Sequence, residues 1–496
     1  MKMVKSLLLG SAAGLVAVAG AQAADLPVKA KAVEYVKVCS LYGAGFYYIP
    51  GTDTCIKIGG FVRAEATYNA GGSFATYLNG ANARFDNGTN RMPFRTRVAL
   101  SADVRTQTEY GTLRSYLRGG WQWSTADSIS ANNNVTYYDR GFIQFAGFTF
   151  GKTESFFDFY PVPLYSYQTQ FFEGSSGGSG QTVFAYTAQF GNGVSASISA
   201  EDQSYRSAAV SPVGAFTVGT TAATASPFSS GAVVNGTPNN NRGGQNIPDF
   251  VGNIRVDQAW GSAQIQGALH NNTAIGYSNA TSPNGAITGP GDKWGWAAGA
   301  GLTLKMPWAA TDTLSLQGTY CEGAVRYCAN ANVNSANSQS AGTATSGFGV
   351  ILRRGGEVSI GYANDAYFGT NGNLELSKAW SLAGGFQHYW TPALRSSVYT
   401  QYLNYEANST TFNAACVTAG LQSGCGDWNG YQIGTRTAWT PVANLEIGVD
   451  LMYTKVDTAF KGGTVNQVVN NGTVSTPIGD NDVWSAIFRV QRNFWP

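Results

Sequence analysis

Alternation of apolar and polar residues along short segments most constrains how this chain of 496 residues can fold. In FRTRVALSADVR, from Phe94 to Arg105, nearly every second residue is apolar, and most of the residues between are arginine, serine or aspartate. Side chains of a β-strand point alternately to its two faces, so the pattern predicts a strand with one apolar and one polar face. The segments Ile56–Tyr68 and Gly111–Trp123 repeat it, with arginines again on the polar face. One such segment fits a soluble sheet equally well, but recurrence along the chain favours a barrel with lipid outside and water inside.

The predicted strands number sixteen, and an even number is typical of single-chain bacterial membrane barrels. They are Ile56–Tyr68, Phe94–Arg105, Gly111–Trp123, Tyr138–Phe148, Glu154–Phe159, Thr182–Phe190, Val194–Glu201, Phe250–Trp260, Ala263–His270, Trp294–Lys305, Thr313–Cys321, Leu374–Trp390, Arg395–Tyr405, Tyr431–Trp439, Leu445–Tyr453 and Val483–Phe494. A further candidate hairpin, Val350–Leu352 with Val358–Tyr362, is assigned to a long loop but would raise the number to eighteen. The connectors alternate between tight turns such as Gly191–Gly193 and long polar stretches such as Asp202–Pro248, as expected for turns on one rim and loops on the other.

The N-terminus resembles an export signal. Lys2 and Lys5 precede an apolar stretch that ends in Ala21-Gln22-Ala23, so residues 1–23 are predicted to be a removable signal peptide. The rest of the chain contains no uninterrupted apolar run of about 18 residues that could cross a bilayer as a helix. We therefore predict an all-β fold, a transmembrane antiparallel β-barrel over residues 24–496 that crosses the bacterial outer membrane many times, with residues 24–55 as a periplasmic lead-in. A secreted all-β lectin or adhesin is the alternative from another class.

Composition supports this fold class and argues against other functions. Only 12% of residues are charged, whereas glycine and the aromatic residues are abundant, which fits strands, tight turns and aromatic girdles. A net charge of +2 is too small for a nucleic-acid-binding protein. Gly147–Thr153 is one residue short of a phosphate-binding loop, and Gly174–Gly178 lacks the strand-to-helix context of a serine nucleophile. No enzymatic activity is predicted.

Cysteine and histidine usage points to an oxidising compartment without a metal site. Six cysteines form three pairs of near neighbours in the sequence and are candidates for disulfides: Cys39 with Cys55, Cys321 with Cys328, and Cys416 with Cys425. His270 and His388 are too few and too far apart in sequence to supply a metal site. No metal and no cofactor is expected.

Two segments resemble a known family. Residues 24–65, ADLPVKAKAVEYVKVCSLYGAGFYYIPGTDTCIKIGGFVRAE, resemble the mature N-terminus of the alphaproteobacterial general porins of Brucella and rhizobia. Residues 145–159, FAGFTFGKTESFFDF, resemble the entry to the third loop of general porins. The resemblance implies a homotrimer of sixteen-stranded channels through which small hydrophilic solutes and ions diffuse passively. Expected partners are these solutes, outer-membrane lipid and lipopolysaccharide, and no nucleic acid.

The segment Tyr160–Gly180 lacks strand alternation, and we expect it to fold inward as the third loop and narrow the channel. By the resemblance it would face a basic wall. The candidate basic residues, on the polar faces of the first three strands, are Arg63, Arg95, Arg97, Arg114 and Arg118. The candidate acidic residues, on or near the loop, are Glu154, Asp158 and Glu173. Five arginines against three acids hint at anion preference. Alternatively, the aromatic residues of the loop could line a substrate-specific channel for sugars or anions: Phe156, Phe157, Tyr160, Tyr165 and Tyr167.

Overall fold

The structure is a computed structural model of the chain. It describes residues 37–71, 75–76, 92–125, 134–160, 164–168, 170, 174–176, 180–211, 242–274, 291–329, 349–354, 357–369, 373–418, 420–469 and 472–494. The predicted signal peptide and the first part of the lead-in lie outside these ranges.

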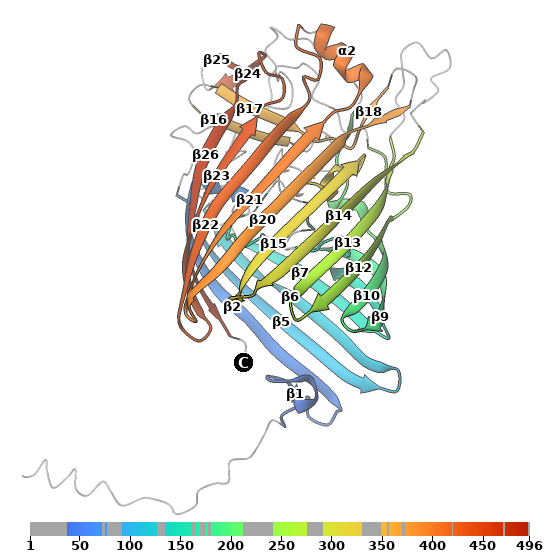
Figure 1. Cartoon of the computed structure of the whole chain (residues 1–496), viewed down its shortest axis with the longest axis vertical. Helices are drawn as coiled ribbons and strands as arrows, with labels where there is room; N and C mark the ends of the chain where they lie inside the picture. The colour runs from blue at the N-terminus through green and yellow to red at the C-terminus, as the bar shows by residue number, and fades with distance from the viewer. Residues whose placement is uncertain are drawn as a thin grey trace, which may run out of the picture.

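Sixteen antiparallel strands form a closed barrel in which each strand pairs with its neighbours in the chain (Figure 1). They are β2 (Thr54–Tyr68), β5 (Phe94–Thr108), β6 (Gly111–Ser124), β7 (Asn134–Phe145), β8 (Phe148–Thr153), β9 (Gln181–Gly191), β10 (Val194–Glu201), β12 (Asp249–Gln258), β13 (Gly261–Asn272), β14 (Lys293–Met306), β15 (Ala309–Glu322), β20 (Lys378–Thr391), β21 (Leu394–Glu406), β22 (Trp428–Val442), β23 (Leu445–Asp457) and β26 (Asn481–Asn493). The barrel closes where β26 pairs with β2, from Phe61 opposite Asn493 to Tyr68 opposite Ala486. The predicted fold class and the number of strands are confirmed.

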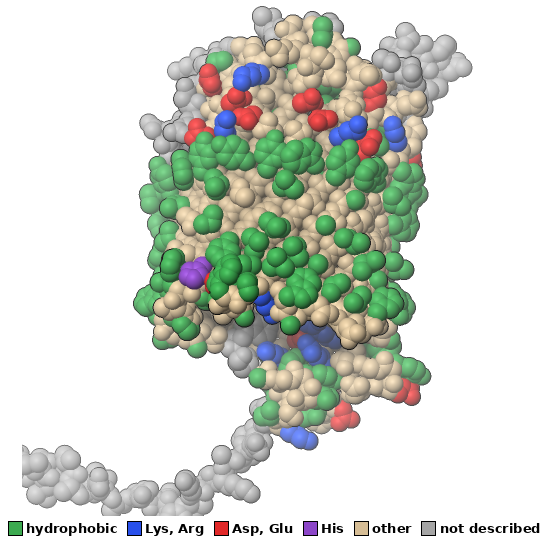
Figure 2. Space-filling view, viewed as in Figure 1, with side chains coloured by type: hydrophobic (Ala, Val, Ile, Leu, Met, Phe, Trp, Pro, Cys, Tyr) green, Lys and Arg blue, Asp and Glu red, His purple; other side chains and the backbone are tan. Residues whose placement is uncertain are grey.

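The two faces of the wall differ as the alternation predicts. On β5, Phe94 and Leu100 are exposed on the outside, whereas Arg95 and Ser101 are buried on the inside. Figure 2 shows hydrophobic side chains in bands around the barrel, with charged side chains gathered above and beneath them. Because lipid accepts apolar groups and excludes charges, this outer surface fits a bilayer. In the described ranges, no helix has the length and apolar character needed to span a bilayer.

The two rims also differ. Seven connections on one rim, such as the one from β9 to β10, are only two residues long. The connections on the other rim are long, for example residues 202–248 and 323–377. Outer-membrane barrels keep short turns on the periplasmic side and long loops outside, so the rims assign the orientation of the chain.

Small elements accompany the barrel at both ends. At the short-turn rim, β1 (Tyr47–Tyr48) follows η1 (Ser40–Tyr42) and pairs with the start of β2. The remaining elements lie within the long connections: β3 (Ala70–Gly71), β4 (Ala75–Thr76), η3 (Gln203–Tyr205), β11 (Val210–Ser211), η4 (Val325–Tyr327), β16 (Gly349–Arg354), β17 (Glu357–Tyr362), β18 (Ala366–Phe368), β19 (Leu374–Leu376), α2 (Thr410–Thr418), β24 (Thr464–Val469) and β25 (Gly472–Pro477).

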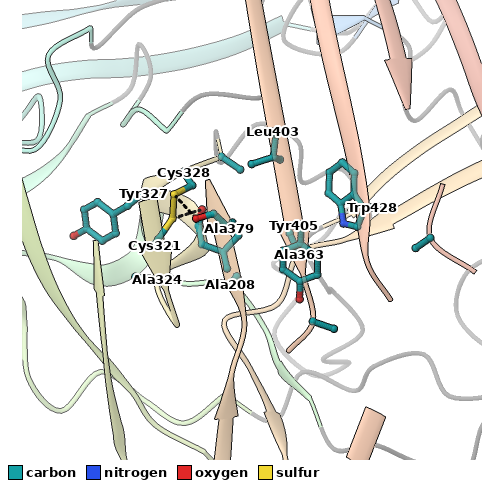
Figure 3. Close-up of a cluster of buried hydrophobic side chains, with 14 of the residues drawn as sticks. Ala208, Cys321, Ala324, Tyr327, Cys328, Ala363, Ala379, Leu403, Tyr405 and Trp428 are labelled. Atoms are coloured by element: carbon teal, nitrogen blue, oxygen red, sulfur yellow. Dashed lines mark hydrogen bonds between the residues drawn. A yellow bond between two sulfur atoms is a disulfide. The ribbon is translucent and has the colours of Figure 1, made fainter. Parts of the chain in front are cut away.

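A hydrophobic cluster packs the long loops against the inside of the barrel strands that carry them. Figure 3 shows its centre, where Tyr327 and the Cys321–Cys328 disulfide lie beside Ala379, and Tyr405 and Trp428 lie further along. All three predicted disulfides are present, since Cys39 is bonded to Cys55 and Cys416 to Cys425.

Two predicted strands were wrong, and a third, Leu374–Trp390, is divided, because β19 pairs with β18 in a small separate sheet and the barrel strand β20 begins only at Lys378. Tyr138–Phe148 is not a single strand, because β7 ends at Phe145 and the chain reverses at Ala146-Gly147, both with positive φ, before β8. Residues 154–159, predicted as the next strand, are loop. The turn lies inside an aromatic run, and Ala146 is not a residue that usually marks φ above zero. The number sixteen nevertheless holds, because β16 and β17 pair only with each other and lie outside the barrel wall.

Candidate functional site

The first three barrel strands bring their arginines together on the inside of the barrel. The register sets Arg63 opposite Arg97 and Glu65 opposite Arg95, and on the next strand Arg118 lies opposite Ser101. All five predicted arginines belong to this face, because each side chain points to the same side of its strand as the buried residues of that strand. The five arginines therefore share the inner face of the barrel, and their role at a constriction stays a prediction.

Three carboxylates on the same face each form ion pairs with two arginines. Glu65 accepts from Arg95 Nε at 2.7 Å and from Arg489 Nε at 2.5 Å. Asp103 accepts from Arg114 Nε at 3.0 Å. It also accepts from Arg105 Nε at 3.0 Å.

Asp139 of β7 lies 3.5 Å from Arg97 Nη2 and 3.3 Å from Arg118 Nε. Arg63, by contrast, donates from Nε to the neutral Gln491 Oε1 at 2.7 Å.

We call these residues the arginine wall: Arg63, Arg95, Arg97, Arg105, Arg114, Arg118 and Arg489 with Glu65, Asp103 and Asp139. Guanidinium groups stay protonated, so seven arginines against three carboxylates leave a positive excess. The side chains of Arg97, Arg114 and Arg118 keep 22%, 28% and 33% of their surface exposed, so the excess charge reaches the water inside the barrel.

The predicted acidic residues lie elsewhere. Glu154 pairs with Arg140 of β7, with Nη2 and Oε1 3.0 Å apart. The side chain of Asp158 is fully buried, where it pairs with Arg206 and accepts from the Ser176 backbone N–H at 2.6 Å. Glu173 lies outside the described residues. Neither described acid has an ion pair with the five predicted arginines.

Described residues of the connection between β8 and β9 hydrogen-bond to inward-facing groups on distant strands. We call residues 154–180 the third loop. Tyr160 Oη lies 2.5 Å from Thr303 Oγ1 of β14, and Tyr165 Oη lies 2.8 Å from Ser315 Oγ of β15. These bonds join residues about 150 positions apart in the chain.

Further along the third loop, the contacts reach β23 and β26. Asp450 accepts from Ser166 Oγ at 2.9 Å and from the Tyr167 backbone N–H at 2.5 Å. Ser485 Oγ of β26 donates to Gln168 Oε1 at 2.5 Å. The loop residues 166–168 therefore lie beside the strand that carries Arg489.

Tyr167 of the third loop contacts one carboxylate and one guanidinium of the barrel wall. Its hydroxyl donates to Glu446 Oε1 at 2.5 Å, and the Arg489 guanidinium lies 4.0 Å from its ring centroid. Burial, together with the nearby Glu446 carboxylate, raises the pKa of the Tyr167 hydroxyl. This tyrosine therefore stays a neutral donor, and Arg489 gains a cation–π contact on its ring face.

Sequence reasoning missed six site residues: Glu65, Asp103, Arg105, Asp139, Asp450 and Arg489. Glu65 and Arg489 each follow the alternation of their strands, so the signal for an inward orientation was present. The missing information was the contact between the first and last strands, which closes the barrel.

A closed barrel of sixteen strands, apolar outside and lined by charges inside, defines an outer-membrane β-barrel of the porin class. The family is identified by sequence: residues 25–487 match the family described as "Porin subfamily", and the chain belongs to it. This membership, with the outward apolar surface, assigns the chain to the bacterial outer membrane, which it crosses many times by strands.

Individual relatives agree. The chain is 35% identical to "Porin Omp2b" of Brucella suis over 272 residues, which are 52% of this chain and 64% of that protein. It is 37% identical to "Porin Omp2a" of Brucella ovis over 217 residues, 40% of this chain and 59% of that protein. The matched region thus spans about three-fifths of each relative.

Among solved structures, the outer membrane channel DcaP of Acinetobacter baumannii is similar, with a TM-score of 0.56 and 16% identity over 90% of this chain and 99% of that one. At this identity the likeness shows the fold.

Proposed function

We propose that the chain is a passive diffusion channel for small hydrophilic solutes and ions, with no catalytic role. A barrel of sixteen strands encloses a lumen too wide to select by itself. In this proposal the third loop folds into the lumen and narrows it, and solutes pass between the loop and the arginine wall.

The observation that carries the proposal is the set of bonds that tie loop residues Tyr160, Tyr165 and Tyr167 to inward-facing groups. These bonds run along the inside of the barrel from β14 to β23, which leaves the part-exposed Arg97 of β5 and Arg118 of β6 across from the loop. A loop held along one side by its own hydrogen bonds reduces the open cross-section without closing it.

Charge then filters what passes. Arginines near low-dielectric walls are screened less than they would be in bulk water, so their excess positive charge favours anions at the narrowest point. Of the two described loop acids, Asp158 acts less on this path than the sequence suggested, because its side chain is buried against Arg206, whereas Glu154 stays part exposed. We therefore propose a stronger anion preference than the ratio of five to three implied.

A substrate-specific channel is the second candidate, and the contacts of the described loop aromatics give it no support. Tyr160 and Tyr165 bond the wall through their hydroxyls, and Phe157 is buried against Tyr327 with ring centroids 4.7 Å apart. These three rings pack the loop against the inside of the barrel, so they do not form a continuous aromatic surface along which a sugar could bind.

Single-channel recording in planar bilayers tests the proposal. We expect an ohmic conductance, a reversal potential on the anion side in a KCl gradient, and liposome swelling rates that fall steadily with sugar size. Block by micromolar amounts of one solute would favour the substrate-specific channel instead.

We also propose that the channel is a homotrimer in contact with outer-membrane lipid and lipopolysaccharide, as in the family it resembles. Mass measurement in mild detergent tests this assembly, and a monomer would contradict it.

A further inference from the structure

The described N-terminal residues form a small disulfide-closed unit at the short-turn rim. We call residues 37–55 the N-terminal knob. Cys39, Cys55 and Phe46 form its buried centre, with Tyr42 and Tyr48 packed against them. Figure 1 shows β1, which belongs to the knob, beneath the barrel at the end opposite the long loops.

The knob adjoins the lower end of the closure between β2 and β26. Pairing of β26 with β2 begins only at Phe61, so the first residues of β2 extend below β26. On that side they pair with β1, with Tyr47 opposite Ile56 and Tyr48 opposite Cys55. The knob is therefore held by strand pairing as well as by the disulfide.

Contacts with Lys57 and Arg105 show which side of the wall the knob covers. Lys57 Nζ donates to the Ala44 carbonyl at 3.1 Å, and the Arg105 guanidinium lies 4.9 Å from the Phe46 ring centroid. The side chain of Lys57 points to the inner side of β2, as Glu65 does. The side chain of Arg105 points to the inner side of β5. The knob thus packs on the lumen side of the rim.

Positive charge gathers where the knob meets the wall. Arg105 and Arg114 share the carboxylate of Asp103, and Lys57 lies opposite Asp103 in the strand register. Three cations against one carboxylate leave a net positive charge at this mouth. Figure 2 shows Lys and Arg side chains in the recess between the base of the barrel and the knob.

An aromatic surface adjoins these cations. Tyr116 and Phe142 are stacked with ring centroids 5.3 Å apart, and the Arg114 guanidinium lies 5.3 Å from the first ring and 5.4 Å from the second. Cation–π contacts of this kind fix the orientation of a guanidinium while its remaining N–H donors stay available.

We propose that the N-terminal knob makes a second narrowing, a vestibule at the periplasmic mouth where Lys57, Arg105 and Arg114 retain small anions. Anions that pass the third loop meet this site before they leave the barrel. The proposal rests on the channel function proposed above, because a vestibule matters only if solutes pass through the lumen.

Variants of the full chain in planar bilayers test the vestibule. The double variant Cys39→Ser/Cys55→Ser loosens the knob, and Arg105→Gln removes its cation–π contact and one positive charge while leaving the disulfide intact. We expect a higher conductance from the first, and from both a shift of the reversal potential in a KCl gradient toward cations.

Matched controls exist for both variants. Arg492→Gln removes an arginine near the same rim that faces outward from β26 and donates to the Ala443 carbonyl. Cys416→Ser/Cys425→Ser opens a disulfide at the opposite rim. Both controls should shift the reversal potential less than the knob variants do.

The outcomes separate the two proposals. A conducting wild-type channel whose conductance and reversal potential are the same in both knob variants would overturn the vestibule and leave the channel function standing. A wild-type chain that inserts without conducting would overturn both. If Cys39→Ser/Cys55→Ser fails to fold, judged by its heat-dependent gel mobility, Arg105→Gln alone decides.

Discussion

Two sides of the barrel interior satisfy their polar groups in different ways. On the arginine wall, charged side chains of β2, β5, β6, β7 and β26 pair mainly with one another, and several stay part exposed. On the side formed by β14, β15, β21 and β23, which we call the loop-bearing wall, inward-facing groups bond the third loop. The same strand alternation thus provides a water-exposed charged surface on one side and an anchoring surface on the other.

The two walls differ in the groups that bond their buried carboxylates. Asp450 of the loop-bearing wall is fully buried, and its bonds come from neutral donors on Ser166, Tyr167, Gln168 and Tyr399. Glu65 of the arginine wall is equally buried but lies between two guanidinium groups. Neutralising Glu65 should therefore lower stability, whereas neutralising Asp450 should change the conductance.

The largest expected effect is on stability, from Glu65→Gln. This change leaves Arg95 and Arg489 buried without their shared carboxylate, and breaking a buried ion pair costs about 3–5 kcal/mol. We expect a large fall in the urea midpoint of unfolding, followed in detergent by tryptophan fluorescence. Asp257→Asn, which removes the partner of the part-exposed Arg255, is the control and should cost at most about 1 kcal/mol. Equal shifts in the two variants would contradict the difference in burial.

The next effect should appear in conductance, from Asp450→Asn. The amide cannot accept all the bonds that Asp450 accepts from the loop, and a hydrogen bond to a charged group contributes about 1.5–3 kcal/mol. The loop should detach part of the time, which would raise the mean single-channel conductance and its noise.

A matched control for this loop anchor is Asp480→Asn, which changes an aspartate that pairs with the exposed Lys461 on the long-loop rim. A conductance unchanged by Asp450→Asn would mean that the loop does not limit the passage.

Sequence alone predicted the barrel well because alternation is a local property of each strand. It also placed the five arginines on one face, since they lie on three consecutive strands. The contact between Glu65 and Arg489 was beyond its reach, because these residues are 424 positions apart and meet only when the last strand closes on the first. Asp158 was assigned to the channel because its ion pair with Arg206 is also a long-range contact. Arg206 belongs to another long connection, and no local sequence pattern predicts that pair.

Selectivity should respond more modestly to Arg97→Gln. Arg97 shares Asp139 with Arg118, so its loss removes one charge from the excess without leaving the carboxylate unpaired. We expect the reversal potential in a KCl gradient to move toward cations. Arg492→Gln is the control, because Arg492 lies in the outward phase at the rim and donates to the Ala443 carbonyl. A similar shift from both would indicate a general surface-charge effect and argue against a role for the wall.

The smallest effect is expected from Glu154→Gln, the described loop acid that does remain accessible. Its side chain is 48% exposed and pairs with Arg140, and exposed ion pairs contribute about 0–1 kcal/mol. Water already screens Glu154, and the buried Arg140 keeps its bond from Nη1 to the Asp139 carbonyl, so neutralising the acid should leave the unfolding midpoint nearly unchanged and shift selectivity slightly toward anions. A shift larger than that of Arg97→Gln, with opposite sign, would mean that the loop side carries the dominant charge in the passage, and the contrast between the two walls would then have to be reversed.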